Sequence, residues 1–283
     1  MTLLEHPVIT PDDIVEIEKL DELAESIRVQ AQQMGPQEVR FLVDTYYQLQ
    51  QRRIGSANQE RSVEKTEEPV AMLNFIGDLD KHYERKVLHM LQAYAQNTDE
   101  ALWAMSITGI GPVLAAGLAS HIDITKAPTA GHIWRFAGLD PTLEWNKGER
   151  RPFNAKLKTL CWKIGESFIK VQNRENDVYG KVYAERKLQE QERNEAGMFA
   201  DQAKAKLEKY KIGKTTEAYK AYSVGKLPPA HINARARRFA IKLFLAHYQH
   251  VAYELHYGEP PPKPYVIEHL GHAHYIAPPN WPM

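Results

Sequence analysis

Two glycines on either side of one isoleucine give the clearest chemical signal in this chain. Residues 107–118 read ITGIGPVLAAGL. Gly109 and Gly111 permit a tight turn, because glycine adopts torsion angles that other residues adopt only at a cost. Pro112 suits the first position of a helix, and Ile110 is expected to fill the space between two helices. The segment therefore predicts a helix-hairpin-helix.

A hairpin of this kind exposes backbone N–H groups beside the positive end of a helix. That combination binds a phosphate oxygen without reading the base sequence. We therefore expect the turn residues Gly109, Ile110, Gly111 and Val113 to contact DNA. The alternative is a plain corner between two helices that binds nothing.

The turn carries no lysine or arginine, so further phosphate contacts must come from other segments. Basic residues gather after the hairpin and near the start of a helix expected from Ala230. The candidates are Arg150, Arg151, Lys156, Lys158, Arg235, Arg238 and Lys242. The last three fall on one helix face. Arg237 points to the apolar side, where it needs a buried partner or marks a site at which the start of the helix is open. A solvated basic face is the alternative.

Charge is distributed unevenly along the chain. The 36 basic and 36 acidic side chains cancel overall, yet residues 1–100 carry 10 Lys+Arg against 19 Asp+Glu, and the rest of the chain carries 26 against 17. A polyanion would dock on the second half. The alternative is that the acidic half packs against the basic half.

The pattern predicts an all-α protein. Alternating strand patterns are absent, whereas Ala, Leu, Glu, Gln and Lys are abundant. Three parts are expected: an acidic helical region over 1–97 for packing or oligomerisation, a helical domain over 98–257 that contains the hairpin, and a proline- and histidine-rich extended arm over 258–283. Seven of the 17 prolines lie in that arm, which excludes a long helix there.

Individual helices follow from apolar spacing and helix starts. We expect them from Thr10-Pro11 onward, from Pro36, from Val70 to Tyr94, from Ala101 to Ser106 with Thr98 as its cap, from Asn154 to Val171, and from Ala230 to Tyr257. Residues 55–69 are expected to form a linker or frayed helix because they are polar. Gly197 is a candidate break in a polar helical stretch over 177–207. The helix from Ala230 is apolar on two sides and should be central.

The hairpin is the first of three motifs in a fixed order. HIWRFAGLDP follows at 132–141, and NAKLKTLCWKIG at 154–165. This order resembles the C-terminal domain of insertion-sequence transposases that pair a RuvC-like DEDD domain with a serine-containing domain, the bridge-RNA-guided recombinases. In that family a GLDP-type turn is followed by an Asn-x-x-Leu-Arg-type helix, and Asn154, Leu157 and Lys158 occupy those places here. The resemblance covers roughly 100–255 and implies DNA binding.

Two departures leave enzymatic activity open. The family's nucleophilic serine lies a few residues after the GLDP-type turn, where this chain reads TLEWNK at 142–147. The acidic nuclease domain is also missing, since residues 1–100 predict helices instead of strands with spaced acids. Without a nucleophile or metal-binding carboxylates, we do not expect strand cleavage by this chain alone.

Other candidate sites are weaker, and no cofactor is expected. His269, His272 and His274 in the arm have a spacing that could bind zinc, but packing of the aromatic-rich arm onto the body explains them equally simply. His247 and His250 lie one turn apart on the last long helix. Cys161 is expected to be a small core residue. A single cysteine, no apolar run long enough for a membrane span and no signal-peptide layout predict a cytoplasmic protein.

Two functions remain as alternatives. The first is a DNA-binding protein of a mobile element or phage, which would hold DNA, with RNA left open, and rely on a partner nuclease. The second is a non-catalytic scaffold that retains a transposase-derived fold and forms a homo-oligomer or binds another protein.

Overall fold

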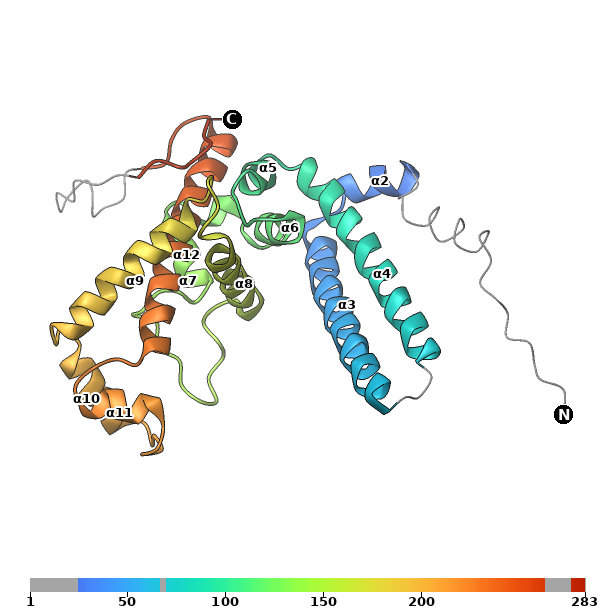
Figure 1. The fold of residues 1–283 in the computed structure, drawn as a ribbon. Coiled ribbons are helices and arrows are strands. Elements are labelled where there is room, and N and C mark those ends of the chain that lie inside the picture. The colour runs from blue at the N-terminus through green and yellow to red at the C-terminus, as the bar shows by residue number, and fades with distance from the viewer. Residues whose placement is uncertain (1–24, 67–69, 263–275, 283) are drawn as a thin grey trace. The chain divides into compact units, whose positions relative to one another are not determined.

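The computed structural model of the chain describes residues 25–66, 70–262 and 276–282. In these ranges the regular structure is entirely helical, which confirms the predicted all-α class. Two compact units are present: residues 1–102 with 115–121, and residues 103–114 with 122–283 (Figure 1). The helices are α2 (Glu25–Gln32), α3 (Pro36–Val63), α4 (Ala71–Gln96), α5 (Asp99–Met105), α6 (Pro112–His121), α7 (Ala130–Phe136), α8 (Ala155–Val171), α9 (Tyr179–Glu195), α10 (Ala200–Lys209), α11 (Glu217–Ser223) and α12 (Pro229–Tyr257), with short 3-10 turns at Glu64–Thr66 and Ile124–Lys126. No helix in the described part is long and apolar enough to cross a membrane.

The first unit is built on two long neighbouring helices, α3 and α4, with α2 packed on α4 (Figure 1). The expected helix from Val70 is confirmed as α4. Of the two alternatives expected over 55–69, a linker or a frayed helix, the structure has helix for residues 55–63, which continue α3, and a 3-10 turn for residues 64–66. These residues are polar but include good helix formers, and the single glycine among them, Gly55, costs only about 1 kcal/mol in a helix. Packing against α4 compensates, because a Cβ on Gly77 would lie 3.7 Å from that of Ser56.

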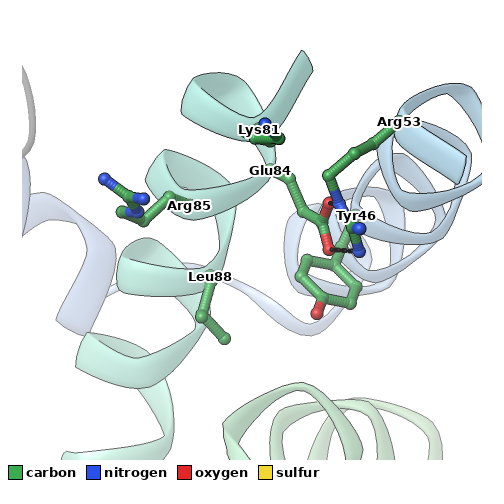
Figure 2. A pocket seen from close by; sticks show the side chains of 6 residues that line it. All are labelled: Tyr46, Arg53, Lys81, Glu84, Arg85 and Leu88. Atoms are coloured by element: carbon green, nitrogen blue, oxygen red, sulfur yellow. Dashed lines mark hydrogen bonds and ion pairs between the residues drawn. The ribbon is translucent and has the colours of Figure 1, made fainter. Parts of the chain in front are cut away.

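Ion pairs, more than apolar contacts, link the middle of α3 to α4. Arg53 donates two hydrogen bonds to the carboxylate of Glu84, one from Nε at 2.5 Å and one from a terminal nitrogen at 3.3 Å. Arg52 pairs with Asp80 at 3.0 Å. Figure 2 shows Arg53 and Glu84 facing each other beside Tyr46, in a hollow of about 300 Å³ that Lys81 also lines. Because both carboxylates are buried, loss of either arginine would leave a charge without compensation.

The second unit is organised around α12, which contacts α7, α8 and α9 (Figure 1). The expected helix from Ala230 is confirmed, with its start one residue earlier, and so is its central position. Phe244 is fully buried and contacts three aromatic rings: Trp103 at 5.9 Å, Phe168 at 5.4 Å and Tyr179 at 5.2 Å between centroids. These contacts join segments that are distant in the sequence into one aromatic core.

Two further expectations concern breaks and ends. The predicted break is confirmed, since α9 ends at Glu195 and Gly197 takes a left-handed φ of +75° before α10. The described end of the arm, residues 276–282, lies on the second unit, as expected. Trp103 donates its indole N–H to the carbonyl of Pro279 at 2.9 Å, and Asn280 donates to the carbonyl of Ser106 at 3.0 Å. The helix start at Thr10, the arm's aromatic residues Tyr265 and Tyr275, and His269, His272 and His274 lie outside the described residues.

Candidate nucleic-acid interface

The turn between α5 and α6 has one strained position rather than two. Gly109 adopts φ +99°, which favours glycine strongly, whereas Gly111 lies outside the left-handed region. Ile110 is buried, and its N–H donates to the carbonyl of Ile107 at 2.9 Å. Thr98 precedes α5 as expected, and its hydroxyl donates a hydrogen bond back to the carbonyl of Tyr94.

The turn is packed against the C-terminal half of α8. Ser167 donates a hydrogen bond from its hydroxyl to the carbonyl of Gly109. A Cβ on Gly109 would lie 3.1 Å from Val171 and 3.2 Å from the Ser167 hydroxyl. Gly111 is exposed, with open space where a Cβ would stand. Within the described residues, the backbone N–H groups of Gly111 and Val113 donate no hydrogen bond. Gly111 is exposed, so its N–H is available to an acceptor outside the chain, whereas Val113 is buried.

A cluster of cations lies near the other end of α8. We call Arg151, Lys158, Arg238 and Lys242 the basic cluster. Phe153 joins its first two members, since the Lys158 ammonium lies 4.2 Å and the Arg151 guanidinium 5.8 Å from the centroid of its ring. Lys242 lies 4.1 Å from the centroid of Trp134. Aromatic faces attract cations without neutralising them.

Burial and mutual repulsion lower the pKa values of three members of this cluster. The pKa of Lys158 is lowered by burial and by the nearby charges of Arg238 and Arg151. Burial and Arg235 lower the pKa of Arg238, and burial lowers that of Lys242, with Asp140 opposing and Arg238 adding to the effect. Among the described residues, no member of the basic cluster forms an ion pair with a carboxylate. An anion bound here would relieve repulsion between cations that are held close together.

Arg235 is occupied differently from the other basic candidates. Its Nε donates to the fully buried carboxylate of Glu190 at 2.6 Å, and Arg186 pairs with the same carboxylate at 2.5 Å. Burial raises the pKa of Glu190, but the two arginines outweigh it and hold the pKa below its usual value. The guanidinium of Arg235 also lies 4.5 Å from the centroid of Phe199. Its first role is therefore to neutralise a buried charge.

The expected partner of Arg237 is present. Arg237 pairs with Glu166 on α8, and its guanidinium lies 5.4 Å from the centroid of the Trp162 ring. Of the remaining candidates, Arg150 and Lys156 are exposed. Asn154 caps α8, since its side-chain oxygen accepts hydrogen bonds from the backbone N–H groups of Lys156 and Leu157, both at 3.0 Å.

The candidate residues therefore fall into two groups that contact α8 at different positions. The hairpin turn contacts α8 at Ser167 and Val171, whereas the basic cluster contacts it at Lys158. At 1.5 Å rise per residue, these positions lie roughly 14–20 Å apart along the helix. That separation equals about four to six base-pair steps along the axis of B-DNA, at a rise of roughly 3.4 Å per step.

His247 and Cys161 are both buried in the second unit. His247 is buried, with one ring nitrogen 2.7 Å from the Tyr179 hydroxyl and the other 2.8 Å from the carbonyl of Ile276. Burial lowers its pKa to about 4. Cys161 is fully buried, and burial raises its pKa to about 12, which agrees with a core role. The described residues contain no group of ligands that could hold a metal ion.

Sequence reasoning missed the aromatic side chains beside the cations. Trp145 is 45% exposed and Trp162 is 50% exposed. Both occur in the stretch 145–162, which reads WNKGERRPFNAKLKTLCW. Aromatic residues interleaved with lysine and arginine are a readable signal for nucleic-acid binding. Glu190 was also missed, because a single carboxylate in a polar helix gives no sign that it is buried.

Comparison with curated proteins gave no match, and comparison with solved structures gave none either. Residues 102–151, however, match the family model described as the transposase IS116/IS110/IS902 family. The matched segment begins in α5, includes the glycine turn, α6 and α7, and ends at Arg151 of the basic cluster. This segment of the chain is therefore similar to the IS116/IS110/IS902 transposases.

Proposed function

We propose that this protein is a transposase-like DNA-binding protein of a mobile element or phage, acting in DNA transposition or recombination. The observation that carries the proposal is the basic cluster, in which Arg151, Lys158, Arg238 and Lys242 converge from three segments, and in which Asp140 acts on Lys242 without forming an ion pair with it among the described residues. Folding tolerates such repulsion where a polyanion supplies the missing charge. The family match over 102–151 supports a role in transposition.

Within this proposal the two groups on α8 have different tasks. The basic cluster supplies affinity for the phosphate backbone. The N–H group of the exposed Gly111, at the start of α6, holds one further phosphate and fixes the register of the DNA. Neither group reads base edges, so binding should depend weakly on sequence. Strand cleavage would be supplied by a partner nuclease, because the segment after the GLDP-type turn offers no serine.

Charge reversal in the basic cluster tests this function. Purified Lys158→Glu/Arg238→Glu protein is titrated into a fluorescent 30-base-pair duplex beside wild type and Lys65→Glu. Lys65 is an exposed residue of the first unit, so the control changes charge away from the cluster. We expect at least tenfold weaker binding for the double variant, with a shallower dependence of affinity on salt. Equal affinity of wild type and double variant would overturn the proposal.

A second candidate function, assembly into a homo-oligomer, rests on a different surface. The side chains Met72, Ile76, Leu79 and Tyr83 recur on α4 at spacings of four, three and four residues and are 74%, 44%, 36% and 56% exposed. Such an apolar stripe is typical of helices that pair with another helix. The partner we propose is a second copy of this chain.

Light scattering after gel filtration tests the assembly. We expect a wild-type oligomer that Ile76→Gln/Leu79→Gln converts to a monomer, whereas Val224→Gln, at a 70% exposed apolar residue of the second unit, leaves it intact. A monomeric wild-type protein at micromolar concentration would exclude this candidate.

A further inference from the structure

Three aromatic side chains run beside the basic cluster in a fixed order. We call Trp145, Phe153 and Trp162 the aromatic track. Trp145 and Phe153 are in edge contact with centroids 6.3 Å apart. Lys158 on α8 lies over Phe153, and Trp162 follows Lys158 by four residues, one helical turn later on the same face. Rings and cations therefore alternate along one path in the second unit.

Both tryptophans of the track are exposed and yet held in place. The indole N–H of Trp145 donates to the carbonyl of Glu149 at 2.9 Å, and the Arg151 guanidinium lies 5.0 Å from its ring centroid. Trp162 has Arg237 over its ring, and the ion pair with Glu166 fixes that arginine. A ring fixed from one side keeps its orientation while much of its surface remains open to solvent.

Exposed indoles are costly for a folded protein, because large apolar rings are normally removed from water. A DNA duplex cannot cover these rings by stacking, since its bases are already stacked on one another and its outer surface is phosphate and sugar. An unpaired nucleotide can cover them, since its free base face stacks on an aromatic ring while its phosphate contacts a neighbouring cation.

We propose that the aromatic track binds unpaired nucleotides, with bases stacked on Trp145 and Trp162 and the intervening phosphates held by Lys158 and Arg238. The inference rests on the proposed nucleic-acid binding and adds its substrate class: single-stranded or locally unpaired nucleic acid is preferred over a continuous duplex. Stacking is tolerant of base identity, so the preference is for strand state and not for sequence.

The test compares strand states in variants of one ring. Wild type, Trp162→Leu and Trp162→Phe are titrated with oligo-dT and oligo-U of 20 nucleotides and with a 20-base-pair duplex. We expect Trp162→Leu to lose at least fivefold in affinity for the single strands and less than twofold for the duplex, while Trp162→Phe stays within threefold of wild type throughout. The oligo-dT and oligo-U arms show whether DNA or RNA is the preferred source of the unpaired nucleotides.

Indole fluorescence gives an independent readout. Stacking of a base on Trp162 should quench part of the emission on addition of oligo-dT, and this part should be absent in Trp162→Leu. Equal losses on single strand and duplex, or no loss on either, would overturn the aromatic track while leaving the basic cluster to be judged by Lys158→Glu/Arg238→Glu. Loss of duplex binding in that double variant, together with unchanged single-strand binding in Trp162→Leu, would contradict this inference alone.

Discussion

Ser167 on α8 donates a hydrogen bond from its hydroxyl to the backbone carbonyl of Gly109, 58 residues earlier in the chain, and so links the glycine turn to α8. The two glycines of the turn consequently have different roles. Gly109 is needed for its left-handed φ and for its close approach to Ser167 and Val171. Gly111 has neither constraint and faces solvent.

Alanine substitutions should separate packing from binding at this turn. We expect Gly109→Ala to lower the free energy of unfolding by about 1–3 kcal/mol, because a Cβ is strained there and has no room. Gly111→Ala should change it by less than about 0.5 kcal/mol while weakening duplex DNA binding, since a methyl group would stand between the turn and a phosphate. Chemical denaturation and a DNA titration check the two effects. Equal destabilisation by both changes would refute the distinction.

Asn154, the first residue of the third motif, should act as a helix cap. Its side chain satisfies the N–H groups of Lys156 and Leu157, and caps of this type contribute about 1 kcal/mol. We expect Asn154→Ala to lose this amount in urea denaturation. Asn154→Asp should retain it, because a carboxylate accepts the same bonds at the positive end of the helix. A full loss in the aspartate variant would point to a role other than capping.

Glu190 should be essential for the stability of the second unit. Its carboxylate is fully buried and neutralises Arg186 and Arg235. Glu190→Gln leaves both arginines without their counter-charge, and we expect a loss on the order of 3 kcal/mol in the free energy of unfolding. Glu192→Gln, at an exposed position of the same helix, is the matched control. Similar unfolding midpoints for the two variants would show that the buried pair contributes nothing.

Acid should destabilise the second unit through His247. Burial lowers the pKa of the folded residue to about 4, a nearby His250 lowers it further, and the bond to the Ile276 carbonyl acts in the opposite direction. An unfolded histidine has a pKa near 6.5, so the unfolded chain binds a proton that the folded chain does not bind between these values. The stabilising contribution is thus present above pH 6.5 and is lost as the pH falls towards 4, by up to about 3 kcal/mol.

The measurement is the free energy of unfolding at a series of pH values. His247→Asn should remove this part of the acid dependence, whatever its effect on stability at neutral pH. His256→Asn, on the same helix but exposed, should keep it. A wild-type protein whose stability is constant between pH 6.5 and 4.5 would contradict the assignment.

Local sequence patterns predicted much of the secondary structure. Apolar spacing predicted α4, α8 and α12, because a helix with one buried side repeats its apolar residues every three or four positions. Gly197 was identifiable as a break, and Arg237 as a residue that needed a buried partner, from their positions alone. The sequence left the polar stretch after Gly55 open between a linker and a frayed helix, because ion pairs and a close contact with α4, which are distant in the sequence, stabilise that end of α3.

The sequence alone determined the all-α class, a glycine turn in a segment similar to a transposase family, and a set of basic residues that could meet a polyanion. Only the tertiary structure decided which of those residues are available to one. Arg235 and Arg238 share a helix face, yet Arg235 forms an ion pair with Glu190, whereas Arg238 lies with Lys158 in the basic cluster. The reason is physical: spacing fixes the direction of a side chain, whereas its charge environment depends on residues of α8 and α9 that only folding brings beside α12.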